Sequence, residues 1–72
     1  MTTQLYFIMC AGAALTIIEG TIWDAADVAV AAATSGASDL SIIRAADRQT
    51  VAILDGKVVQ PTAHANDAEI GL

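Results

Sequence analysis

An alanine-rich segment with well-marked ends, residues 22–35, constrains the fold of this chain more than any other feature. Thr21 and Asp24 have the spacing of a helix capping box, with Asp in place of the usual Glu or Gln. Gly36 stands where a left-handed residue commonly ends a helix. Because alanine has the highest intrinsic helix propensity, the sequence predicts one helix over residues 22–35.

A helical wheel separates this helix into a polar side and a side of small apolar residues. The polar side carries Asp24, Asp27, Ala31, Thr34 and Ser35, and the opposite side carries Ile22, Ala25, Ala26, Ala29, Ala32 and Ala33. Side chains this small let a helix lie close to a sheet, but they contribute little apolar area. Most of the core volume is therefore expected to come from strands.

The segments on both sides of the helix have the composition of strands. Residues 4–11 and 15–19 are rich in aromatic and β-branched side chains and flank a turn at Gly12, which predicts a hairpin. A single helix over residues 5–19 is the alternative, but the aromatic start and the Ile-Ile-Glu-Gly ending favour strands. Further strands are predicted over residues 39–46, 50–54 and 57–60, and Pro61 ends the last one.

The Asp55-Gly56 dipeptide is the strongest hairpin signal in the chain. A two-residue turn at these positions pairs Leu54 with Lys57, Ile53 with Val58 and Ala52 with Val59. Both faces of the sheet are then apolar, because Val51, Ile53 and Val58 lie on one face and Ala52, Leu54 and Val59 on the other. On the strand before this hairpin, Arg44 shares a side with Leu40 and Ile42, and we expect it to pair with an acid.

These elements predict the α+β class, with an antiparallel sheet of four to five strands in ββαββ order and one helix on one face. Residues 1–60 form the single domain, and residues 61–72, which follow no period, form a flexible tail. One helix covers only one face, and a bare apolar sheet face marks an interaction surface. We expect an oligomer interface at Trp23, Val30, Leu54 and Val59.

The small size of the chain is a second reason to expect an oligomer. A chain of 72 residues buries only about 60% of its unfolded surface, so small domains often add disulfides, a metal or oligomerisation. One Cys and one His provide neither a disulfide nor a four-ligand zinc site. We therefore expect a homodimer, without cofactor or metal, in a reducing cytoplasm.

Neither a membrane segment nor a secretory signal is expected near the start of the sequence. The apolar run over residues 5–18 is shorter than the about 20 residues that a membrane helix needs. A secretory signal would carry positive charge before its apolar run, whereas the first basic residue here is Arg44.

Charge and residue chemistry exclude several functions. Eight acids against three bases give a net charge of −5, which disfavours direct nucleic-acid binding and suits docking on a basic protein surface. Such a charge also keeps an apolar protein in solution. Cys10 lies in an apolar run, and His64 has no catalytic partner nearby. No catalytic residues are therefore expected, and the chain does not read as an enzyme.

In size, charge and layout the chain resembles small acidic anti-CRISPR proteins of phages and mobile elements. The resemblance is carried by LTIIEG, TIWDAADVAVAAATSGASD, LSII and TVAILDGKVV, within residues 4–60. It implies an inhibitor that occludes a basic nucleic-acid-binding surface of a CRISPR effector. On this hypothesis the partner contacts are Glu19, Asp24 and Asp27. The alternative is a homo-oligomeric structural domain whose sheets pack face to face.

Overall fold

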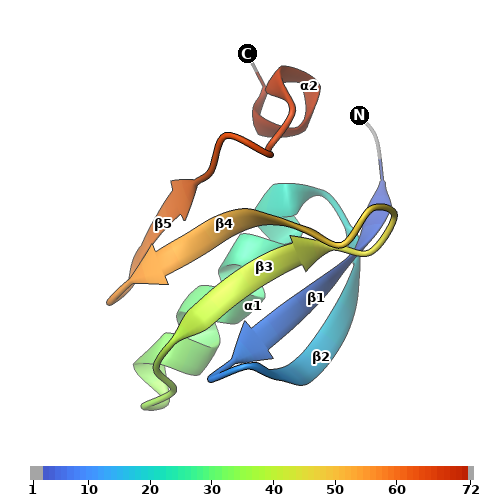
Figure 1. The fold of residues 1–72 in the computed structure, drawn as a ribbon. Coiled ribbons are helices and arrows are strands. Elements are labelled where there is room, and N and C mark those ends of the chain that lie inside the picture. The colour runs from blue at the N-terminus through green and yellow to red at the C-terminus, as the bar shows by residue number, and fades with distance from the viewer. Residues whose placement is uncertain (1–2, 72) are drawn as a thin grey trace.

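The computed structural model describes residues 3–71, which form five strands and two helices (Figure 1). Their order is β1 (Gln4–Cys10), β2 (Ala13–Gly20), α1 (Ile22–Thr34), β3 (Leu40–Arg44), β4 (Gln49–Asp55), β5 (Val58–Pro61) and α2 (Asp67–Ile70). The strands make one antiparallel sheet in the order β2-β1-β3-β4-β5. The predicted α+β class is confirmed. The predicted ββαββ order holds in part, because three strands follow α1 and a short second helix ends the chain.

Local contacts set both ends of α1 as predicted. The Thr21 Oγ1 accepts from the Asp24 N–H at 3.2 Å, and the Asp24 carboxylate accepts from the Thr21 N–H at 2.9 Å. At the other end Gly36 has a φ of 103°, and its N–H donates to Ala33 O at 3.1 Å. Ala37 N–H donates to Ala32 O at 3.0 Å, which completes a Schellman motif.

The first strand lies near the middle of the sheet, between β2 and β3. Tyr6 is opposite Ile18 on β2 and Arg44 on β3, whereas Phe7 is opposite Ile17 and Ile43. Since successive side chains alternate between faces, Tyr6 and Phe7 lie on opposite sides of the sheet. The β1–β2 hairpin confirms the strand interpretation over the helical alternative for residues 5–19.

The core lies between α1 and one face of the sheet, which we call the covered face. Ile22 and three alanines of α1 are buried, as the helical wheel predicts. Ala32 and Ala33 are half-buried against the core, while the predicted polar side of the helix is exposed. The sheet contributes the larger buried side chains, which are Tyr6, Ile8, Leu40, Ile42 and Val51.

The β4–β5 hairpin differs from the predicted register. Leu54 pairs with Val59 and Asp55 with Val58, so the two turn residues are Gly56 and Lys57. Gly56 has a φ of 63° and takes the first turn position, which is where a type II′ turn places glycine. The predicted pairs were therefore wrong by two positions. A shift of two residues keeps each side chain on its face, so Leu54 and Val59 still lie together.

A β-bulge in β4 corrects the predicted position of Val51. The register against β3 shifts between Ile42, opposite Ala52, and Ile43, opposite Thr50, which leaves Val51 as the extra residue. As a result Val51 and its neighbour Ala52 are both buried in the core. The strict alternation that assigned Val51 to the face of Ile53 fails at this bulge.

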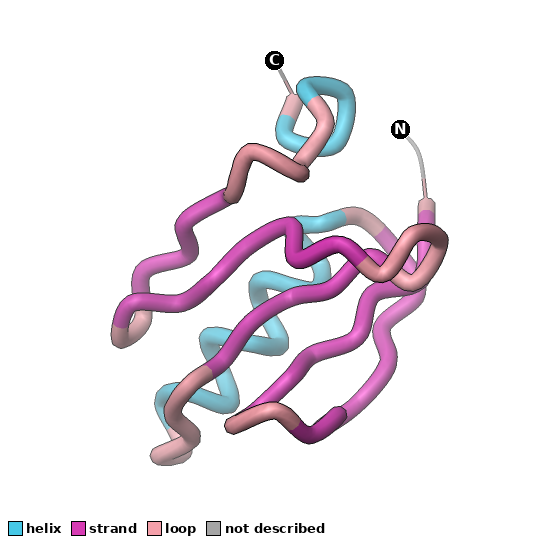
Figure 2. The backbone as a smooth tube through the Cα atoms, viewed as in Figure 1, coloured by secondary structure: helices cyan, strands magenta, loops and turns pink. Residues whose placement is uncertain are grey.

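The segment after Pro61, for which the sequence predicts a flexible tail, returns to the domain. Thr62 N–H donates to Val51 O at 2.9 Å, and α2 begins five residues later on the side of the sheet that carries α1. Figure 2 shows this path as a loop that leaves β5 and ends in one short turn of helix. Ala65 and Ile70 pack against the core, so the segment covers the end of the core beside the start of α1.

Candidate interaction surface

The face of the sheet turned away from α1 carries a contiguous set of apolar side chains. Cross-strand pairs place Phe7 beside Ile17 and Ile43, and Ser41 beside both Met9 and Ile53. Paired residues lie on the same face of a sheet. We call this surface the open face and define it by Leu5, Phe7, Met9, Ile17, Ile43 and Ile53.

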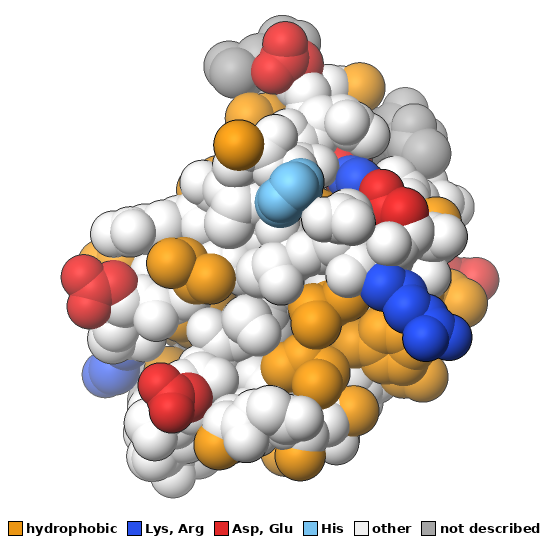
Figure 3. Space-filling view, in the orientation of Figure 1, with side chains coloured by type: hydrophobic (Ala, Val, Ile, Leu, Met, Phe, Trp, Pro, Cys, Tyr) orange, Lys and Arg blue, Asp and Glu red, His pale blue; other side chains and the backbone are white. Residues whose placement is uncertain are grey.

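No described segment covers the open face. Leu5, Ile17 and Ile53 are 47%, 54% and 45% exposed, which is unusual for aliphatic side chains that lie together. Figure 3 views this face and shows hydrophobic side chains gathered over the central strands, with a basic side chain next to them. A shallow depression here is lined by Phe7, Met9, Ala14, Ile43 and Arg48. The bare apolar sheet face expected from the sequence is thus present.

The four residues expected in an oligomer interface lie outside the open face. Leu54 and Val59 are half-buried against the core on the covered face, and Val30 is half-buried on α1. Trp23 is 46% exposed at the start of α1. Their role in an interface stays a prediction. The sheet side chains that are about half exposed, Leu5, Ile17 and Ile53, lie on the open face instead.

The three predicted partner-binding acids surround the junction between β2 and α1, and all three are exposed. Glu19 lies opposite Leu5, so it stands at the rim of the open face. Asp27 lies on the polar side of α1. Asp24 is occupied by the capping box. The structure therefore places Glu19 beside the apolar surface, whereas Asp24 stabilises the start of α1.

A buried polar network lies on the covered face of the sheet, under α2. The Tyr6 hydroxyl donates to Glu69 Oε2, and Arg44 Nη1 donates to Glu69 Oε1. Arg44 Nε also donates to Asp47 Oδ1 at 3.0 Å, and Nη1 donates to His64 O at 3.2 Å. Only 3% of the Glu69 side chain is exposed. The sequence led us to expect one acid partner for Arg44, and the structure gives it two, Asp47 and Glu69.

Each ionisable group of this network has a shifted pKa with a physical cause. Burial raises the pKa of Tyr6, and the hydrogen bond to Glu69 raises it further. Burial alone would raise the pKa of Glu69, but the donors Tyr6 and Asn66 N–H and the charge of Arg44 outweigh it, so that pKa is lowered. The hydrogen bond to Asp47 raises the pKa of Arg44, and it lowers the pKa of Asp47. The network therefore holds a fixed set of charges at neutral pH.

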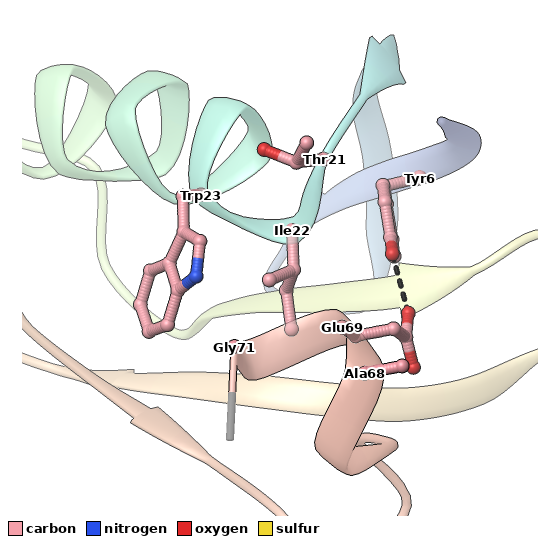
Figure 4. Close-up of a pocket in the computed structure, with 7 residues that line it drawn as sticks. All are labelled: Tyr6, Thr21, Ile22, Trp23, Ala68, Glu69 and Gly71. Atoms are coloured by element: carbon pink, nitrogen blue, oxygen red, sulfur yellow. Dashed lines mark hydrogen bonds between the residues drawn. The ribbon is translucent and has the colours of Figure 1, made fainter. Parts of the chain in front are cut away.

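A small pocket adjoins this network, between the start of α1 and α2 (Figure 4). Its volume is about 100 Å³, below the roughly 300–1,000 Å³ of typical ligand sites. It is lined by Tyr6, Thr21, Ile22, Trp23, Ala68, Glu69 and Gly71. In residues 3–71 no three His, Cys, Asp or Glu side chains are grouped as metal ligands. Every polar group of the network has a partner within it, so its geometry suits anchoring α2.

Sequence reasoning did not identify Tyr6 or Glu69 as members of this network. Tyr6 reads as one more aromatic of a buried strand, and Glu69 reads as part of a polar tail. The one available signal was Asn66 followed three residues later by Glu69, which is the spacing of a capping box. In the structure the Asn66 N–H donates to the Glu69 carboxylate at 3.0 Å, which is the half of the box that Glu69 supplies.

We expect the network to make stability depend on acid pH. The pKa of Glu69 is lower in the folded chain than in the unfolded one, as is that of Asp47, so both stabilise the fold above the unfolded values of about 4. The free energy of unfolding should therefore fall as the pH drops below about 4.5. Urea unfolding of the wild type and Glu69→Gln over this range measures it. The free energy of unfolding of Glu69→Gln should depend less steeply on pH than that of the wild type. Asp67→Asn is the control. If Glu69→Gln and the wild type show the same pH dependence, other carboxyls cause it.

Comparison with protein-family models, curated proteins and solved structures finds no match for this chain. Among residues 3–71, neither helix is long and apolar enough to cross a membrane. The open face and the charges around it are the features of this chain that bear on its function.

Proposed function

We propose that this chain is a non-enzymatic protein-binding module that docks through its open face. One observation carries the proposal: three aliphatic side chains on the uncovered side of the sheet remain about half exposed, although α1 and α2 both pack on the other side. An apolar surface of this kind gains free energy when a partner removes it from water. The shallow form of the depression at Phe7 and Ile43 suits a protein surface better than a small ligand.

The charge of the surface favours a basic partner. Arg44 binds two of the eight carboxylates, Asp47 and Glu69, which leaves six exposed acids against two exposed bases, Arg48 and Lys57. The six exposed acids that Arg44 does not bind are Glu19, Asp24, Asp27, Asp39, Asp55 and Asp67. An excess of negative charge attracts a positively charged surface and accelerates association with it.

The resemblance to small acidic anti-CRISPR proteins makes the proposal more specific. On this basis the partner is a CRISPR effector in the cytoplasm, and the module occludes the basic surface on which the effector binds nucleic acid. Apolar contact by the open face and the acids at its rim, Glu19 first, would supply the binding energy and the specificity.

Inhibition of nucleic-acid cleavage by a panel of purified CRISPR effector complexes tests this function. Ile53→Asp places a charge on the open face at a side chain that is 45% exposed, so the core stays closed. We expect the wild type to inhibit at least one effector, and Ile53→Asp to inhibit about tenfold less, because burying an unpaired charge costs more than about 1.4 kcal/mol. Ala31→Asp, on the exposed side of α1, is the matched control.

Two outcomes would contradict the proposal at different levels. If no effector is inhibited, the effector is not the partner class. If Ile53→Asp and Ala31→Asp inhibit as strongly as the wild type, the open face is not the docking surface.

A further inference from the structure

One edge of the sheet carries a strand with a free backbone side. β2 is last in the strand order and pairs only with β1. Along Ala13–Gly20, the N–H and C=O groups that point away from β1 have no strand partner among the described residues. Figure 1 shows no other element beside β2 on its outer side. Such an edge readily pairs with a further strand.

The sequence of β2 does little to protect this edge. The strand is eight residues long, contains neither Pro nor Lys, and carries one charge, at Glu19. Its bulge is at Leu15, opposite the Ile8–Met9 step, so the pairing from Thr16 to Gly20 is regular. Leu15 and Ile17 are 53% and 54% exposed. Long, apolar and regular edges are the ones that associate.

The other edge of the sheet is protected. β5 has four residues, follows Lys57 and ends at Pro61, whose nitrogen donates no hydrogen bond. Addition of β2 to β5 of a second copy would leave free edges at both ends and would produce a filament. Because β5 is blocked in this way, the association that remains open to β2 is with another β2, and this association closes at two copies.

We propose that β2 pairs antiparallel with β2 of a second copy, about a two-fold axis at Ile17, and joins the two sheets edge to edge. In this register Ile17 faces its own copy. Phe7 and Ile43 lie in the same row on each side, so the apolar row continues across the junction. The small core, with four alanines among its ten buried apolar residues, explains why a second copy would stabilise the fold.

The charges of the strand permit this register. Glu19 lies two residues from the axis, so the two copies of Glu19 are separated by about 14 Å at about 3.4 Å per residue. This distance exceeds the Debye length of about 8 Å at physiological ionic strength. Each Glu19 instead lies opposite the bulge residue Leu15 of the other copy, next to the regular pairing of Thr16, Ile17 and Ile18 at the centre. The proposed dimer does not depend on docking by the open face to a foreign partner, and it would double that face.

The mass in solution of the wild type and of two lysine variants tests the dimer. We expect the wild type at twice the 7.4 kDa of one chain. Ile17→Lys places two like charges side by side on the axis and should weaken the dimer by about tenfold or more. Ile53→Lys, at a position that is 45% exposed against 54% for Ile17 and lies on the same face but on β4, should remain a dimer. Circular dichroism verifies that both variants fold.

A mixing experiment separates the edge-to-edge dimer from other arrangements. Ile17→Lys and Ile17→Glu should each be monomeric, and their equimolar mixture should recover the dimer, because opposite charges then meet across the axis. A monomeric wild type would overturn the proposal. So would a mixture that stays monomeric, or an Ile53→Lys variant that dissociates as fully as Ile17→Lys, which would indicate sheets packed face to face.

Discussion

Glu69→Ala is expected to lower the free energy of unfolding by about 3 kcal/mol, the low end of the cost of breaking a buried ion pair. The substitution leaves the fully buried Tyr6 hydroxyl without an acceptor and removes one of the two carboxylates that bind Arg44. For a domain of this size such a loss corresponds to a melting temperature lower by roughly 12–24 °C. Thermal and urea unfolding measure it.

Asp67→Ala is the matched control, because it removes an exposed carboxylate from the same short helix. It should change stability little. A double-mutant cycle with Tyr6→Phe adds a sharper test. Tyr6→Phe should cost clearly less in the Glu69→Ala background, where the hydroxyl has already lost its acceptor. Additive costs would mean that the two side chains do not act as one unit.

Gly20→Ala is expected to cost about 2 kcal/mol, within the range of overpacked interiors. Gly20 is buried beside the first turn of α1, and a Cβ at this position would lie 2.4 Å from Asp24 Oδ2. The carboxylate would have to leave the N–H of Thr21, so the variant would combine steric strain with the loss of half the capping box. Chemical unfolding measures the change.

The variant Asp24→Ala tests whether the Asp24 carboxylate causes the cost of Gly20→Ala. Without the carboxylate, the nearest atom that limits the new Cβ is the Cβ of residue 24, at 3.1 Å instead of 2.4 Å. We expect the cost of Gly20→Ala to fall by about half in this background. An unchanged cost would place the strain in the backbone at Gly20. Asp27 is a better probe of partner binding than Asp24, because substitution of Asp24 also weakens the helix cap.

How far the fold was predictable depends on the sequence distance over which each contact acts. The capping box of α1 joins residues three apart, and the Schellman motif at its other end joins residues three and five apart. The polar and apolar sides of α1 and the β1–β2 hairpin follow from equally local patterns. These elements were predicted in type and to within a few residues in extent.

The predictions that failed involve choices between alternatives of similar local energy. Asp55-Gly56 allows the glycine at the first or the second turn position, and pairing along β4 and β5 selected the first. No residue type announces the bulge that buries Val51 beside Ala52. The segment after Pro61 has no periodic pattern of apolar residues. Glu69 nevertheless accepts hydrogen bonds from Arg44 and Tyr6, which lie 25 and 63 residues earlier in the chain.

The candidate site divides in the same way. Alternation along β1 was sufficient to predict two apolar faces, one of them bare. Which face α1 covers was settled by packing, so the exposed apolar surface consists of Phe7, Ile17 and Ile53 and their neighbours, with Leu54 and Val59 on the other side. Sequence alone determined the helix, its caps and the presence of a second apolar face, because these follow from contacts between close neighbours. Only the tertiary structure decided the bare face and the buried Arg44 network, because both require residues distant in the chain to meet.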